Sequence, residues 1–144
     1  MSARFNSSLI LCLLLVLHVH AQPQAPGADF QAFWSKFKSA VTSGNKSTVA
    51  DLTKFPLSMP SGTKAVKSKE DLVRRYGEIF NGEANAAQCF AAAKPGKSSD
   101  QQGQYEVYCP FKKTPNDMEN APIRYIFEST KSGWKFTGLD NINE

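Results

Sequence analysis

The segment from Ser68 to Phe80 carries signals for the start, the course and the end of a helix. Ser68 is a capping residue, and Asp71 three positions later completes a capping-box pattern. Asn81-Gly82 follows as a stop signal. We therefore predict one helix over residues 68–80, with Arg75 in solvent and an apolar stripe that must be buried by the rest of the domain. The stripe consists of Leu72, Val73, Tyr76, Ile79 and Phe80.

The first 21 residues have the three parts of a secretory signal peptide. Arg4 gives the positive start, residues 9–17 form an apolar run too short to span a bilayer, and Val19-His20-Ala21 supplies the cleavage pattern. We predict cleavage after Ala21 and export to a periplasm or the cell exterior; the alternative is an uncleaved anchor. Residues 22–28 would then be a flexible lead-in, and residues 29–144 a single domain.

Charge and composition argue against several kinds of partner and cofactor. The chain has 17 Lys and Arg residues, of which only Arg4 lies in the signal, and 13 Asp and Glu, so the mature net charge is +3. This small, scattered charge does not predict nucleic-acid binding. Both histidines lie in the signal, which leaves no usual zinc ligand set, and no cofactor motif is present. After cleavage we expect no stable membrane insertion.

Two cysteines remain in the mature chain, Cys89 and Cys109. An exported protein meets an oxidising compartment, so a disulfide is the first interpretation, and two buried free thiols are the alternative. A hairpin between residues 84–93 and 104–112, with its turn at 97–101, would place the two cysteines opposite each other. Such a bridge would contribute about 3 kcal/mol in the chain-entropy model.

Two shorter helices are predicted before the central one. Asp29 would cap the first, which carries an aromatic stripe at helical spacing and stops at Gly44. The stripe is either core or the wall of a pocket, and it consists of Phe30, Phe33, Trp34, Phe37 and Val41. Asn45 would cap a second helix to about Leu52, although Asn45-Lys46-Ser47 is also a glycosylation sequon.

The rest of the domain is expected to form strands. Residues 55–57 leave the helices, because Phe55 precedes a proline, and residues 63–67 form a short edge strand. Residues 84–93 and 105–111 are predicted strands, followed by a long polar loop at 112–122. The last hairpin pairs 123–130 with 134–139. With Ser132-Gly133 as its loop, Phe127 faces Gly138 and Ser129 faces Phe136, which puts the hairpin's aromatic residues on one side.

This order of elements resembles the NTF2-like (SnoaL-like, cystatin-like) superfamily, and among its members exported bacterial proteins without assigned activity. The resemblance covers about residues 29–139 and depends on the aromatic first helix, Gly44-Asn45, Phe55-Pro56-Leu57, the Ser-Lys-Glu-Asp helix start and the closing Gly-Trp-Lys-Phe hairpin. It implies an α+β fold in which N-terminal helices and one long helix pack on a curved antiparallel sheet, forming a cone that often holds a ligand or an active site.

The expected function is non-catalytic binding of a small apolar molecule or a protein partner through this cone. The predicted lining consists of Phe33, Phe37, Tyr76, Phe80, Tyr125, Phe127, Trp134 and Phe136. A homodimer through the sheet is a further expectation. The alternative function is an isomerase or hydratase of the ketosteroid isomerase or SnoaL-like type, but relatives of that kind use a carboxylate or a histidine with aspartate as base. The mature chain has no histidine, and no carboxylate can be assigned to the cone from the sequence.

Overall fold

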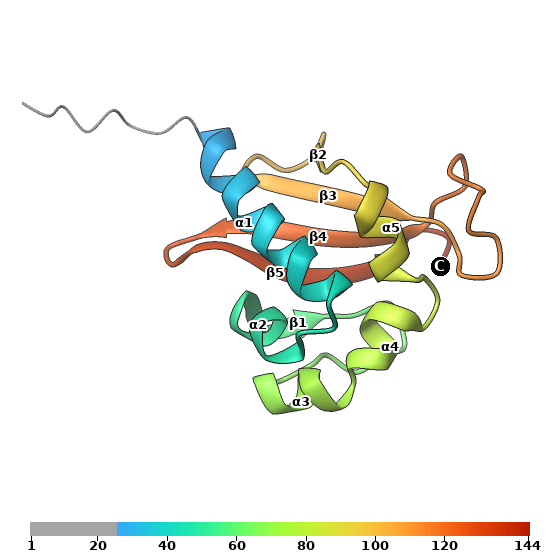
Figure 1. Ribbon diagram of the computed structural model, residues 1–144, viewed down its shortest axis with the longest axis horizontal. Coiled ribbons are helices and arrows are strands. Elements are labelled where there is room, and N and C mark those ends of the chain that lie inside the picture. The colour runs from blue at the N-terminus through green and yellow to red at the C-terminus, as the bar shows by residue number, and fades with distance from the viewer. Residues whose placement is uncertain (1–25) are drawn as a thin grey trace, which may run out of the picture.

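The computed structural model describes residues 26–144, which form five helices and a curved, open sheet of five strands (Figure 1). The first and the last helix cross one face of the sheet, and the other three are grouped toward one of its edges. The predicted signal peptide, residues 1–21, lies outside the described residues, as do residues 22–25. The strand order is β1-β5-β4-β3-β2, with β1 parallel to β5 and the other pairs antiparallel. The fold is therefore α+β, with helices packed on a curved sheet as predicted. Among the described residues, no helix is long and apolar enough to cross a membrane.

The first two helices follow the predicted pattern. Helix α1 (Pro26–Thr42) begins at a proline, which suits the first turn, so Asp29 lies within that turn and is not the cap. Gly44 then takes a φ of 68°, which lets the chain turn into α2 (Lys46–Asp51). The side chain of Asn45 accepts a hydrogen bond from the Thr48 N–H at 3.0 Å, which confirms the predicted cap.

The predicted helix over residues 68–80 is split into α3 (Lys69–Arg74) and α4 (Tyr76–Asn81). Ser68 caps α3 as predicted, but the Asp71 carboxylate accepts from the Lys67 N–H, one residue before the capping-box position. Arg75 forms the break, with ψ near 11°, and its guanidinium donates to the Lys64 carbonyl at 2.8 Å.

This break has two consequences for the predicted helix. Arg75 is half-buried, so its predicted position in solvent is wrong. The change of direction also puts Val73 at 40% exposure, whereas Leu72, Ile79 and Phe80 are buried as expected.

Residues 84–93 form a helix, so the predicted strand there is wrong. Helix α5 (Ala86–Ala92) is capped by Asn85, whose side chain accepts from the Gln88 N–H at 3.1 Å, and its alanines have the highest helix propensity. The structure contains the predicted Cys89–Cys109 disulfide, with a Cα–Cα distance of 5.8 Å. The bridge joins α5 to strand β3 (Gln104–Cys109) and does not join two neighbouring strands.

The edge strands differ most from the sequence prediction. Strand β1 (Thr53–Ser58) pairs in parallel with β5 (Gly133–Asn141), whereas the predicted strand at 63–67 is reduced to one bridge between Leu57 and Val66. Strand β2 (Gly96–Lys97) occupies the other edge and pairs with β3. The sheet was predicted to be antiparallel, but it is mixed, because β1 pairs in parallel at one edge.

The final hairpin forms, but beside its loop the predicted register is wrong by two residues. Strand β4 (Ile123–Thr130) pairs Phe127 with Phe136, and Ser129 with Trp134, so the loop is Lys131-Ser132. Gly133 has a φ of 91°, which a glycine adopts most easily at this position. Because side chains alternate with a period of two, this shift keeps the aromatic residues beside the loop on their predicted face. A register change between Ile126 and Phe127 then pairs Tyr125 with Leu139, so the shift beyond it is one residue.

Candidate functional site

The eight aromatic residues predicted to line the cone belong to one connected cluster between the helices and the sheet. Phe127 lies at its centre, with ring centroids 5.1 Å from Phe37 and 5.6 Å from Phe136. Phe33 contacts Phe37, Tyr76 contacts Phe80, and Tyr125 contacts Phe80 and Phe136. Trp134 joins through Phe30, at 4.9 Å. Phe37, Phe80, Tyr125, Phe127 and Phe136 are at most 3% exposed, so these side chains fill the interior themselves.

The cluster reaches cavities at three different places on its margin. Tyr125 lines a pocket of about 170 Å³ between α4 and the ends of β4 and β5. Tyr76 and Phe80 line a more open one of about 430 Å³ beside the end of α1, and Trp134 lines a third of about 520 Å³ beside the β2–β3 loop. The structure thus gathers the predicted residues into one cluster, but those that line a pocket are distributed among three separate pockets.

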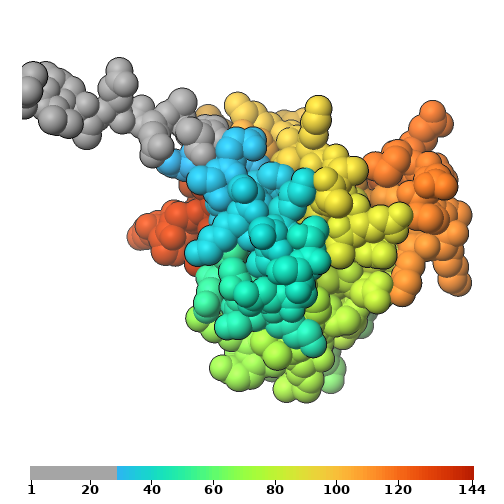
Figure 2. Space-filling view, viewed as in Figure 1, coloured from blue at the N-terminus to red at the C-terminus, as the bar shows by residue number. Residues whose placement is uncertain are grey.

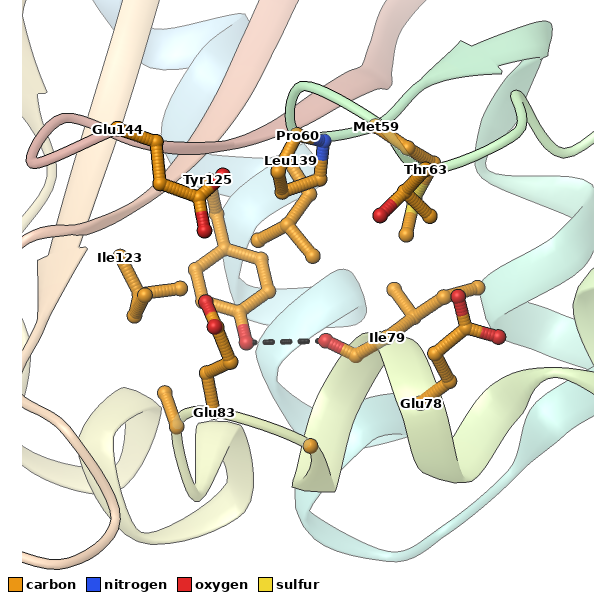
Figure 3. Close-up of a pocket in the computed structure, with 12 residues that line it drawn as sticks. Met59, Pro60, Thr63, Glu78, Ile79, Glu83, Ile123, Tyr125, Leu139 and Glu144 are labelled. Atoms are coloured by element: carbon orange, nitrogen blue, oxygen red, sulfur yellow. Dashed lines mark hydrogen bonds between the residues drawn. The ribbon is translucent and has the colours of Figure 1, made fainter.

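The pocket beside Tyr125 is the candidate functional site (Figure 3). Its floor is apolar because α4, β4 and β5 each turn buried side chains toward it, from Ile79, Ile123, Tyr125 and Leu139. The loop after β1 closes the opposite side with Met59, Pro60 and Thr63. Since the Tyr125 ring also packs in the aromatic cluster, this pocket backs directly onto the aromatic interior.

Three carboxylates stand at the rim of this pocket, and each is held by another group of the chain. Glu78 makes a two-pronged pair with Arg75, at 2.6 and 2.8 Å, and this hydrogen-bonded pairing lowers the pKa of Glu78. Glu83 and Glu144 both accept from the side-chain amide of Asn141, at 3.2 and 3.4 Å. Asn141 is only 5% exposed, so its buried amide holds the carboxylates of Glu83 and Glu144 in position.

Tyr125 supplies a hydroxyl at the pocket floor, but this hydroxyl already donates a hydrogen bond within the protein. The hydroxyl donates to the Ile79 carbonyl at 3.1 Å, and the side chain is fully buried (Figure 3). Burial raises the pKa of this hydroxyl, so it stays neutral and committed to the α4 backbone.

The geometry of the pocket suits the binding of an apolar group. A general base should have a pKa tuned toward neutrality, whereas the pairing of Glu78 with Arg75 moves its pKa the other way. Within residues 26–144, no group of three or more His, Cys, Asp or Glu side chains could hold a metal ion. The apolar floor and its volume suit a small hydrophobic group.

Most residues of this pocket were not singled out by the sequence. The prediction selected aromatic side chains, whereas the pocket wall is mainly aliphatic and includes residues before α3 and after β5. The turn pattern at Pro60-Ser61-Gly62 marks a loop, but nothing in the sequence shows that this loop faces Ile123 and Leu139 across a pocket. That arrangement follows from the parallel pairing of β1 with β5, which the sequence did not predict.

Comparison with known proteins gives matches at the level of structure alone. No known family profile and no curated protein matches the chain. Solved structures do match, among them an NTF-2 like protein of unknown function from Shewanella oneidensis MR-1, at 12% identity and a TM-score of 0.44 over 81% of this chain and 98% of the other.

Two matching structures carry names that refer to enzymes. A ketosteroid isomerase-like protein from Erwinia carotovora atroseptica SCRI1043 is 14% identical, with a TM-score of 0.44 over 78% of this chain and 92% of the other. The hexachlorocyclohexane dehydrochlorinase LinA-type3 from Novosphingobium barchaimii LL02 is 10% identical, with a TM-score of 0.44 over 79% and 83%. At these identities no residue role passes from these proteins to this chain.

Proposed function

We propose that this NTF2-like chain is an exported, non-catalytic domain that binds a small apolar ligand, or an apolar side chain of a protein partner. The binding place is the pocket beside Tyr125, which backs onto the aromatic interior. One observation carries the proposal: the pocket has a buried apolar floor, while the polar groups around it are already held by Arg75, Asn141 and the Ile79 carbonyl. The eight aromatic residues stay a prediction for the wider lining.

The size of the pocket sets the size of the ligand. About 170 Å³ is close to the volume of an engineered apolar cavity in another protein, about 150 Å³, which binds benzene. The ligand group is therefore expected to be a single ring or a short branched chain. The rim carboxylates favour a neutral or cationic group at the open end.

Toluene is the probe that fits these dimensions, and Thr63 is the position for a blocking variant. Thr63 is exposed on the loop that closes the pocket, and Figure 3 shows it directed toward Ile79 and Leu139. A Thr63→Phe ring should occupy the pocket without disturbing the buried core. We expect saturable toluene binding by NMR titration, weakened about tenfold or more in Thr63→Phe, a change of about 1.4 kcal/mol.

The matched control is Thr63→Val, which keeps the shape and loses only the hydroxyl. It should bind toluene as the unaltered protein does. Absence of toluene binding, or equal binding by Thr63→Phe in a folded protein, would contradict the proposal. If toluene binds as expected, mass spectrometry of molecules that co-purify with the protein would identify the natural ligand.

The second candidate function is an isomerase or hydratase of the ketosteroid isomerase or SnoaL-like type. It requires a proton-transfer group in reach of the substrate, and the pairing of Glu78 with Arg75 argues against that residue. We expect no turnover of a Δ5-3-ketosteroid; measurable isomerisation that Glu83→Gln abolishes would favour the enzyme. The predicted homodimer through the sheet does not depend on either function, and light scattering would test it.

A further inference from the structure

The loop between β3 and β4, residues 110–122, stands out from the body of the molecule beside α5 (Figure 2). The groove between them, which we name the α5–loop groove, encloses about 330 Å³. Ala92 and Ala93 form its helical wall, and Phe111, Pro115 and Met118 form its loop wall. Met118 is 59% exposed, a large exposure for an apolar side chain, so this groove presents apolar surface to solvent.

Both walls of the groove are fixed in place. The Cys89–Cys109 disulfide joins α5 to the end of β3, directly before the loop. Within the loop, the Thr114 N–H donates to the Phe111 carbonyl at 2.9 Å, and the Asp117 N–H donates to the Thr114 carbonyl at 3.0 Å. A groove with rigid walls loses little conformational entropy when a partner enters it.

The polar margin of the groove is basic. Lys94 and Lys112 line it, Lys113 is the next residue along, and all three are exposed. Among the described residues, none of these lysines forms an ion pair, and none of the side chains that line the groove is acidic. Glu83 lies in the adjoining cavity past Lys112, and the exposed Asp117 and Glu119 flank Met118 along the loop without lining the groove. The basic margin is therefore confined to the side of Lys94, Lys112 and Lys113.

From this apolar groove with a basic margin, we propose that the α5–loop groove docks a segment of a partner protein in which an apolar side chain is flanked by acidic residues. The apolar side chain enters between Met118 and the alanines of α5, and the carboxylates pair with Lys94, Lys112 and Lys113. Methionine adapts its shape to different apolar side chains, which suits a docking groove. This surface is distinct from the ligand pocket beside Tyr125 and does not depend on it.

A protein segment fits the groove better than an anionic membrane surface. A bilayer binds apolar side chains that project from a convex surface, whereas here Phe111 is half-buried and faces α5 across a concavity. An extended chain can place one side chain in the concavity and still bring carboxylates to lysines on either side.

A phage-displayed library of random twelve-residue peptides tests the proposal even though the partner is unidentified. The purified protein should select peptides in which Phe, Leu or Met lies next to Asp or Glu. For a selected peptide, Lys112→Glu/Lys113→Glu should weaken binding about tenfold or more by fluorescence polarisation, because attraction becomes repulsion. Met118→Asp should weaken binding to a similar degree, and added salt should weaken binding to the unaltered protein.

The matched control changes the same number of charges elsewhere. Lys64→Glu/Lys131→Glu alters two exposed lysines outside the groove and should change the affinity less than about twofold. Thermal melts establish that each variant is folded. No selection of peptides, selection without acidic residues, equal loss in the control variant, or binding to phosphatidylserine vesicles in place of peptides would each overturn the proposal.

Discussion

Glu106 lies on the sheet face opposite the helices, yet it is only 6% exposed. Its carboxylate accepts from the Gln104 amide at 2.7 Å and from the Tyr108 hydroxyl at 2.6 Å, and Arg124 lies 3.6 Å away. Burial raises the pKa of Glu106, but these hydrogen bonds and the charge of Arg124 lower it by more, so its net pKa is below the ordinary value of 4.5. The folded state therefore favours the ionised form.

This shift predicts how stability depends on pH at a single residue. A lowered folded-state pKa stabilises the fold above pH 4.5, and the stabilisation is lost as the pH falls through the folded pKa. Glu106→Gln should be less stable than the unaltered protein at neutral pH, and the difference should shrink in acid. Urea unfolding between pH 7 and pH 3 measures this.

The exposed Glu119→Gln serves as the control and should follow the unaltered protein at every pH. A constant difference between Glu106→Gln and the unaltered protein across the pH range would show that the side chain acts by packing alone.

At the scale of elements, the Cys89–Cys109 disulfide was predicted correctly, but from a hairpin that the structure does not contain. The hairpin argument placed residues 84–93 in a strand because Cys89 and Cys109 are equally far from a polar turn. The alanines and the Asn85 cap indicate a helix at the same residues, and these local signals decide the structure. Spacing therefore predicted the contact between the two cysteines but not the elements that carry them.

The bridge ties α5 to β3 across a sequence separation of 20, and its removal gives a prediction at this scale. Cys89→Ala/Cys109→Ala should lower the free energy of unfolding by about 3 kcal/mol, because the unfolded chain gains the freedom that the bridge removes. Urea unfolding measures the loss, and the unaltered protein in reducing agent should show the same one. Equal stability of the oxidised protein and the double variant would contradict this account.

Two helix caps were predicted better than the break inside the long helix and the edge strands. Asn45 and Ser68 cap helices as their types suggest, because a cap is a local interaction within four residues. The break at Arg75 depends on the Lys64 carbonyl, which lies outside the helix, so the helical period in residues 68–80 could not show it.

For the whole molecule, the sequence predicted the fold class and the apolar interior, because alternation in β4 and the aromatic stripe of α1 each fix an inward face. It did not predict the order of the strands in the sheet. Strands β1 and β5 are far apart in sequence, and neither segment by itself shows that the two pair. The candidate pocket depends on that pairing, which is why its aliphatic wall went unpredicted while the aromatic cluster did not.

Export is the remaining prediction at this scale. The disulfide is compatible with an oxidising compartment, and residues 1–21 have the pattern of a cleaved signal. Protein recovered from the periplasm or the medium should begin at Gln22 by N-terminal sequencing. Material with Met1 intact in the membrane fraction would show that the apolar run is an anchor.

The pairing of β1 with β5 also delays the completion of folding until the end of synthesis. Thr53 lies opposite Phe136, and the Phe136 N–H donates to the Leu52 carbonyl at 2.9 Å. Residues near position 53 therefore pair with residues that are made about 80 positions later. While a ribosome is still adding residues before 133, β1 has no strand beside it, and the aromatic face of α1 lacks Trp134 and Phe136. An emerging chain therefore keeps its N-terminal half open until β5 has been made. For the proposed export, this means that the chain remains open enough to be translocated until its last strand has been made.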